Sequence, residues 1–150
     1  MATPKHALPV RWAVSLAVLV LAVVAAPVQG GTAKAATATT TFTRGDGGLC
    51  YAVSTASWTG YQVNRVRHIF KFADDPEGYA TFTTTAFDKG SQASGTQVSV
   101  SNRPVRLPGE GWFVHAIFRS NGGAHLAEAV SPVAYAPADC PIPPPGGPWG

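Results

Sequence analysis

Residues Trp112–Arg119 read WFVHAIFR and carry the clearest strand signal in the chain. Successive side chains of a β-strand point to opposite faces. One face of this segment would carry two aromatic rings with Val and Ala between them, and the other would carry Phe113, His115, Ile117 and Arg119. Both faces are largely apolar, which is typical of a central strand. We therefore expect this segment near the middle of a sheet, with its second face covered by a loop or a partner.

The chain on either side of this segment also alternates between apolar and polar residues with period two. Turn residues such as those of Asp74–Gly78 and Asn121–Gly123 separate the alternating stretches. The expected strands are Ala38–Arg44, Leu49–Ser54, Tyr61–Ala73, Tyr79–Phe87, Thr96–Leu107 (broken at Asn102–Pro104), Trp112–Arg119 and His125–Ala134. Seven strands within about 100 residues predict an all-β chain folded as a single Greek-key sandwich.

The third expected strand has one face suited to a core and one suited to solvent. Val66, His68, Phe70 and Phe72 share one side, and we expect this side to face the interior. The opposite side carries Arg65, Arg67 and Lys71, with Ile69 among these charges.

Two short segments resemble known families. Residues 112–123, followed by Ala129-Val130-Ser131-Pro132-Val133, resemble the last hairpin of fibronectin type III and related immunoglobulin-like domains. This resemblance implies an immunoglobulin-like sandwich and assigns no functional residues. Residues 48–53, which read GLCYAV, are similar to a segment of the small secreted α-amylase inhibitors, which are also disulfide-bonded β-sandwiches.

The first 35 residues have the signature of a secretory signal peptide. A basic start with Lys5 and Arg11 precedes Trp12–Ala26, which is apolar except for one serine. Small residues then lead to a cleavage site predicted before Ala36. The apolar run is shorter than the roughly 20 residues that a spanning helix needs. We therefore expect a secreted protein without a membrane span.

Removal of this leader changes the electrostatic balance. The whole chain carries a formal net charge of +3, but Lys5, Arg11 and Lys34 lie within the leader, so residues 36–150 hold eight basic and eight acidic side chains. A net charge of about zero gives no support for nucleic-acid binding. We expect one sandwich domain at 36–140 and a disordered Pro/Gly-rich tail at 141–150. A proline-rich ligand for another domain is the alternative for this tail.

The only two cysteines, Cys50 and Cys140, are expected to form a disulfide. Loop-entropy reasoning predicts that a disulfide closing such a long segment contributes roughly 4 to 5 kcal/mol of stability. Two free thiols are the alternative.

A candidate binding surface follows from the second faces of two strands. If the third and sixth strands are neighbours, an apolar patch ringed by three arginines would stand on the outside of the sheet, and its residues are Phe113, Ile117, Ile69, Arg65, Arg67 and Arg119. Patches of this kind tend to mark contact sites. Alternatively, the tail or a crossing loop covers these residues as part of the core.

Trp58 and Tyr61 form a second candidate contact. The surrounding sequence, Ser57-Trp58-Thr59-Gly60-Tyr61, predicts a turn that would expose the tryptophan. A rigid aromatic side chain on a loop offers a large contact area to a protein or carbohydrate. The alternative is that both rings cap one end of the core.

Residues with catalytic or metal-binding chemistry form no familiar pattern in the chain. No nucleophile elbow, paired carboxylates or Cys/His motif is present. We expect His115 and His125 to be about 10 Å or more apart on the last hairpin, too far to share an ion, and we expect no metal and no cofactor. The predicted function is a secreted, non-enzymatic binding module for a protein or carbohydrate outside the cell. An inhibitor of an extracellular enzyme, such as a glycosidase or protease, and an enzyme without a familiar motif remain open.

Overall fold

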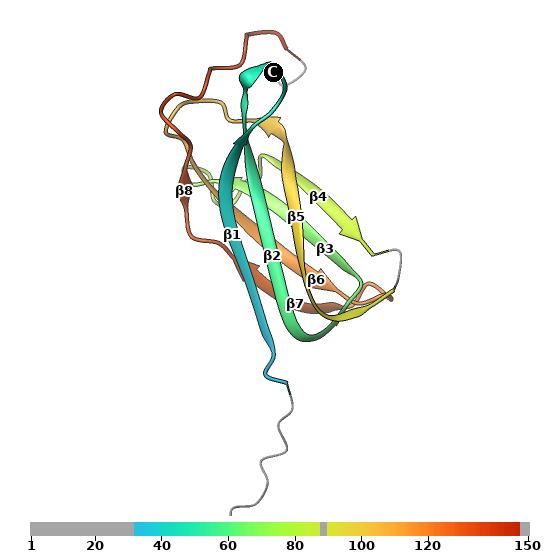
Figure 1. Cartoon of the computed structure of the whole chain (residues 1–150). Helices are drawn as coiled ribbons and strands as arrows, with labels where there is room; N and C mark the ends of the chain where they lie inside the picture. The colour runs from blue at the N-terminus through green and yellow to red at the C-terminus, as the bar shows by residue number, and fades with distance from the viewer. Residues whose placement is uncertain (1–31, 88–89, 148–150) are drawn as a thin grey trace, which may run out of the picture.

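The protein is all-β and folds as two antiparallel sheets packed face to face, as a computed structural model shows for residues 32–87 and 90–147 (Figure 1). Sheet A has the strand order β1-β2-β5, and sheet B has the order β4-β3-β6-β7, with β8 also pairing with β6. The strands are β1 (Ala35–Arg44), β2 (Cys50–Val63), β3 (Arg65–Phe72), β4 (Thr81–Ala86), β5 (Gln92–Pro104), β6 (Gly111–Arg119), β7 (His125–Val130) and β8 (Ala134–Tyr135). The expected all-β, two-sheet architecture is confirmed.

The core lies between the sheets and is built by alternate residues of the central strands. The inward side chains of β6 are those expected, and Trp112, Val114 and Phe118 are fully buried. Val66, His68 and Phe70 of β3 are also fully buried, as their alternation predicted. Because β2, β3 and β6 lie inside their sheets, their inward residues contact neighbours on every side, which buries even the large rings.

Polar pairs join the two sheets around this core. The Ser54 hydroxyl of β2 lies 2.8 Å from Nδ1 of His68 on β3, and the burial of His68 lowers its pKa to about 4. Near β1, the hydroxyls of Thr40 and Ser131 are 2.6 Å apart. On the opposite side, Thr81 and Thr83 of β4 hydrogen-bond Asn102 and Ser99 of β5. The sheets are therefore linked by hydroxyl groups at both edges and in the centre.

The second strand is longer than the sequence predicted, and this corrects the position of Trp58. The turn expected at residues 55–60 is absent, and β2 runs unbroken to Val63. The Ser and Thr residues read as a turn instead alternate with buried Ala56 and Trp58. Gly60, with φ of 73°, introduces an irregularity in the pairing with β5, and the chain crosses to the other sheet at Asn64.

Two other boundaries also differ from expectation. The break predicted at Asn102–Pro104 occurs as an irregularity within the strand: β5 continues to Pro104, but its pairing with β2 has a register shift between Val100 and Pro104. The last expected strand is divided into β7 and β8 by Ser131-Pro132-Val133. Here the backbone N–H of Val114 donates to the Ser131 hydroxyl and not to a backbone carbonyl. Proline has no N–H to donate to a ladder, which accounts for the interruption.

The ends of the domain lie at opposite ends of the sandwich (Figure 1). Most of the predicted leader, residues 1–31, lies outside the described residues, and the first strand begins at Ala35. Residues 141–147 of the predicted tail form no strand and run beside the end of the domain that carries the disulfide. In the part of the chain that the structure describes, no helix is long and apolar enough to cross a bilayer.

Candidate functional site

The outer face of sheet B brings together the candidate surface residues from β3 and β6. These strands pair along their whole length, as the sequence argument required, with Arg67 opposite Ile117 and Ile69 opposite His115. Because the core side chains of both strands point inward, their alternate residues form one outer surface. We call this surface the sheet B face, and its residues on β3 and β6 are Arg65, Arg67, Ile69, Lys71, Phe113, His115, Ile117 and Arg119.

The edge strands extend this face on both sides, which the sequence did not indicate. Phe82 of β4 lies opposite Ile69, and Val130 of β7 lies opposite His115. Their side chains are 44% and 59% exposed, whereas Ile69, Phe113 and Ile117 are partly buried. A direct row of Phe82, Ile69, His115 and Val130 therefore crosses all four strands. A lone Phe among the threonines of β4 was the only sequence signal for this extension.

The arginines of the sheet B face gather at the end where β3 begins and β6 ends. Arg65 and Arg119 stand directly opposite each other in the β3–β6 register. Arg67 stacks on the Phe82 ring, with its guanidinium carbon 4.2 Å from the ring centre, and Arg119 donates to the Gly123 carbonyl. Among the described residues, no ion pair joins Arg65, Arg67 or Arg119 to a carboxylate. These three side chains are called the arginine cluster below.

The acidic side chain of this face, Glu128, is engaged by two histidines. Its Oε2 lies 3.0 Å from Nε2 of His115 and 3.6 Å from Nε2 of His125. The hydrogen bond with His115 and the charges of both histidines lower the pKa of Glu128. His125 stands opposite Arg119, four residues along β6 from His115, which agrees with the expected separation on the hairpin. Their contact with the same carboxylate was not expected. A register shift between Phe118 and Arg119 places His125 on the same face as Glu128.

This histidine pair does not amount to a metal centre. No group of three or more ligating side chains able to hold a metal ion occurs within residues 32–87 and 90–147. The prediction of no metal site stays a prediction for the whole chain. The contact between the histidines and Glu128 does, however, leave the arginine cluster without this carboxylate.

Trp58 and Tyr61, the second candidate contact, do not belong to an exposed loop. Trp58 is 2% exposed, packs against Phe87 and Phe118 at ring-centre distances of 5.4 and 5.8 Å, and donates from Nε1 to the Gln92 carbonyl. Tyr61 is partly buried beside the same cluster. The interpretation that these rings cap one end of the core therefore agrees with the structure, and the expected exposure of Trp58 is wrong.

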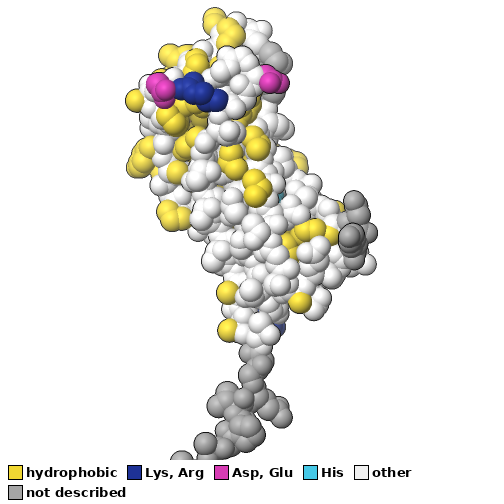
Figure 2. Space-filling view, in the orientation of Figure 1, with side chains coloured by type: hydrophobic (Ala, Val, Ile, Leu, Met, Phe, Trp, Pro, Cys, Tyr) yellow, Lys and Arg dark blue, Asp and Glu magenta, His cyan; other side chains and the backbone are white. Residues whose placement is uncertain are grey.

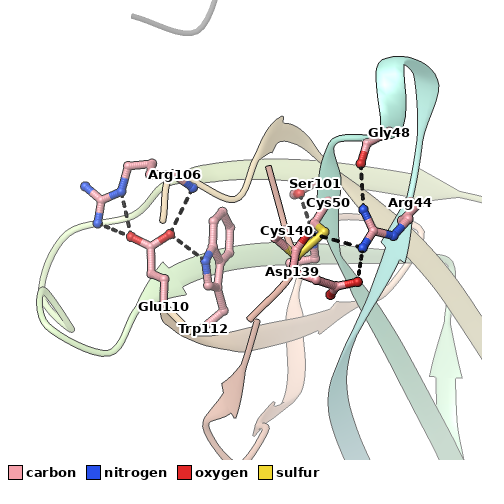
Figure 3. The surroundings of a disulfide bond; sticks show 10 residues. Arg44, Gly48, Cys50, Ser101, Arg106, Glu110, Trp112, Asp139 and Cys140 are labelled. Carbon is pink, nitrogen blue, oxygen red and sulfur yellow. Dashed lines mark hydrogen bonds and ion pairs between the residues drawn. A yellow bond between two sulfur atoms is a disulfide. The ribbon is translucent and has the colours of Figure 1, made fainter. Parts of the chain in front are cut away.

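The disulfide between Cys50 and Cys140 closes the opposite end of the core (Figure 3). It ties the start of β2 to the segment that follows β8. Beside it, the Glu110 carboxylate accepts from the Trp112 indole N–H and from Arg106, and Arg44 pairs with Asp139. The pairing predicted from the two cysteines is thus present at this end of the molecule.

A small hollow lies near this end, between the tail and the end of β5. Its volume is about 270 Å³, and its walls are Phe72, Arg103, Pro104, Arg106 and residues 142–146. Arg106 stacks on Phe72 at 3.6 Å and pairs with Glu110. The hollow is slightly smaller than the roughly 300 Å³ at which small-molecule sites begin, and Arg106, one of the two arginines that line it, is already paired with a carboxylate.

The outer face of sheet A has a different chemistry. Rows such as Thr39-Thr55-Val98 and Thr41-Val53-Val100 cross its three strands. Figure 2 shows this side of the molecule, where the charged side chains gather near one end. The uncharged hydroxyl and valine side chains offer few groups that could orient a partner.

No protein-family model, curated protein or solved structure matches this chain. Evidence for its function therefore comes from the geometry of its surfaces. Among these, the sheet B face combines exposed apolar groups with arginines that form no ion pair within residues 32–87 and 90–147.

Proposed function

We propose that this protein is an exported, non-enzymatic binding module of immunoglobulin-like Greek-key topology that binds its partner on the sheet B face. The carrying observation is the β3–β6 pairing, which places Ile69, Phe113 and Ile117 on one outer surface beside the arginine cluster. Apolar groups surrounded by cations are typical of contact sites, with the apolar part supplying desolvation and the charges supplying orientation.

The strand order supports the topological part of this proposal. The first, second and fifth strands form one sheet, and the other sheet contains the third, sixth and seventh strands, with the third and sixth in its centre. Constant-type immunoglobulin domains divide their strands in the same way except for the fourth, which they place beside the fifth. Here the fourth strand pairs with the third instead.

Export is supported by the disulfide and by the leader-like sequence of residues 1–35. The expected product begins at Ala36. Amino-terminal sequencing of the protein recovered from the culture medium tests this proposal. A protein that keeps its first residues and stays in the cytosol with reduced cysteines would refute it.

The binding role is tested by removing the apolar part of the face. The double substitution Phe113→Ser/Ile117→Ser should abolish capture of the partner that wild-type protein retains from culture medium and cell envelope. The matched control is Val98→Ser/Val100→Ser, which changes two exposed valines of sheet A and should leave capture unchanged. Equal capture by both variants would refute the assignment of the site.

A second variant separates loss of binding from loss of fold. Phe82 and Val130 lie on edge strands and are about half exposed, so Phe82→Ser/Val130→Ser should retain the circular-dichroism spectrum of the wild type. Its binding to the partner should nevertheless be at least several-fold weaker than that of the wild type. If Phe82→Ser/Val130→Ser binds fully and Phe113→Ser/Ile117→Ser unfolds, Phe113 and Ile117 serve the fold alone.

A further inference from the structure

We infer that the partner of the sheet B face is an acidic polypeptide, with carboxylates that contact the arginine cluster and apolar side chains that cover the row of Phe82, Ile69, His115 and Val130. This inference rests on the proposed function and adds the chemistry of the partner. Its starting point is an arrangement of like charges that the isolated domain does not need.

The cross-strand pair of Arg65 and Arg119 is unfavourable in the free protein. Like charges directly opposite each other on neighbouring strands destabilise a sheet. Arg67, two residues along β3, adds a third cation. The Nε atoms of Arg65 and Arg67 are buried and have no hydrogen-bond partner among the described residues. Buried donors are normally paired, so these two are unfavourable in the free protein. Both side chains are only partly buried, and an incoming acceptor would bind their exposed parts.

Carboxylates are acceptors suited to these guanidinium groups. An arginine can bind a carboxylate through two parallel N–H···O bonds, which are stronger than bonds between neutral groups. Glu128, on the same face, already contacts His115 and His125. Acidic groups of a partner would therefore meet three arginines with no competing carboxylate of this chain among the described residues.

The apolar members of this row, Phe82, Ile69 and Val130, decide between a polypeptide and a simple polyanion. Strands are spaced about 4.8 Å apart, so the row from Phe82 to Val130 extends about 14 Å across the sheet. Along the strands, the backbone of this row lies about 7 Å from that of Arg67 and about 13 Å from that of Arg65 and Arg119, at roughly 3.3 Å per residue, and the Arg67 guanidinium reaches the Phe82 ring. Sulfated or carboxylated sugars have no apolar side chains to bury against Ile69 and Val130. A polypeptide with acidic and apolar residues a few positions apart satisfies both parts of the face.

The test measures binding of defined polymers to the folded, disulfide-bonded protein. The probes are a fluorescent random copolymer of glutamate and tyrosine, poly-L-glutamate, and dextran sulfate, each measured by fluorescence anisotropy at low salt. We expect the copolymer to bind at least several-fold more tightly than the other two polymers. Added salt should weaken binding, because part of it is charge attraction.

Two charge variants locate the site. Arg65→Gln/Arg119→Gln should weaken binding of the copolymer at least tenfold. The control, Arg44→Gln/Arg103→Gln, removes the same charge from exposed positions outside this face and should change the affinity less than twofold. Phe82→Ser/Val130→Ser should weaken the copolymer several-fold and leave poly-L-glutamate unaffected.

Three results would overturn the inference: equal effects of the two charge variants, equal or tighter binding of dextran sulfate, or no binding of the copolymer to the wild type. The last result would leave the capture experiment with Phe113→Ser/Ile117→Ser untouched, so a failure of the partner chemistry and a failure of the proposed function are distinguishable.

Discussion

The outer faces of the two sheets are built by the same alternation of residues and yet differ sharply in chemistry. The sheet A face presents threonine, serine and valine, with Val98 and Val100 as its exposed apolar residues. The sheet B face presents the arginine cluster beside Ile69, Phe113 and Ile117. Both faces are compatible with a stable sandwich, because the core requires only the inward residues. The core therefore does not require the cations of sheet B, although Arg67 and Arg119 make local contacts with Phe82 and Gly123.

The largest expected effect concerns Trp58 and whether sheet A has an aromatic contact residue. Trp58→Ala should lower the free energy of unfolding by about 3 to 5 kcal/mol, because it removes a buried ring that packs on Phe87 and Phe118. Urea unfolding followed by circular dichroism measures this. Val98→Ala on the outer face is the control and should change stability by about 0.5 kcal/mol or less. A comparably small effect at Trp58 would restore it as a surface contact.

The two sheets, and with them both faces, are expected to unfold as one cooperative unit. The disulfide links β2 of sheet A to the segment after β8 of sheet B. Replacing Cys50 and Cys140 by alanine should therefore cost about 4 kcal/mol through the larger entropy of the unfolded chain. The loss should appear as one unfolding transition at a lower denaturant concentration. Two separate transitions, or an unchanged curve after verified reduction, would contradict this prediction.

The free energy of unfolding is expected to depend on pH through His68, which lies between the sheets. Burial lowers the pKa of His68 to about 4 in the folded protein, whereas an unfolded histidine has a pKa of about 6.5. Between these values only the unfolded chain takes up the proton, so stability is complete above pH 6.5 and falls as the pH decreases towards 4. The expected loss is about 3 kcal/mol.

Unfolding measured at a series of pH values tests this dependence. Ser54→Ala/His68→Leu should remove the part of the slope of stability against pH that comes from His68, without leaving the Ser54 hydroxyl unpaired. The lowered pKa of exposed Glu128 acts in the same direction at more acidic pH, so Glu128→Gln serves as a second control. A slope that persists in the Ser54→Ala/His68→Leu variant would assign it to other groups.

The smallest expected effect tests the charge difference itself. Arg65→Thr should raise the stability by about 0.5 kcal/mol, because it removes the repulsion with Arg119 and because threonine favours strands. The reciprocal variant, Thr39→Arg/Thr55→Arg, creates a like-charge pair on the sheet A face and should lower stability by a similar amount. Salt should reduce both differences. A loss of stability in Arg65→Thr would show that this arginine supports the fold.

The candidate surface was predictable in its centre and not at its margins. Alternation along Trp112–Arg119 and along β3 assigned their inward and outward residues correctly, because period two determines the face of each side chain. Phe82 and Val130 were missed, since the register that places them beside Ile69 and His115 depends on pairing with edge strands. The contact of His115 and His125 with Glu128 was missed because it depends on a register shift.

The sequence by itself determined the strand-rich architecture, the inward faces of β3 and β6, and the pairing of the only two cysteines, because these follow from local periodicity and from a count of residues. Only the tertiary structure decided that residues 55–60 continue a strand and that Trp58 is buried. Ser, Thr and Gly are compatible with either a turn or a strand, and the choice depends on the neighbours available. Here β1 and β5 pair with both sides of β2, and Gly95 stands opposite Trp58, where a side-chain carbon would lie within 2.7 Å of the ring. The space for this ring exists only once the distant strands are assembled.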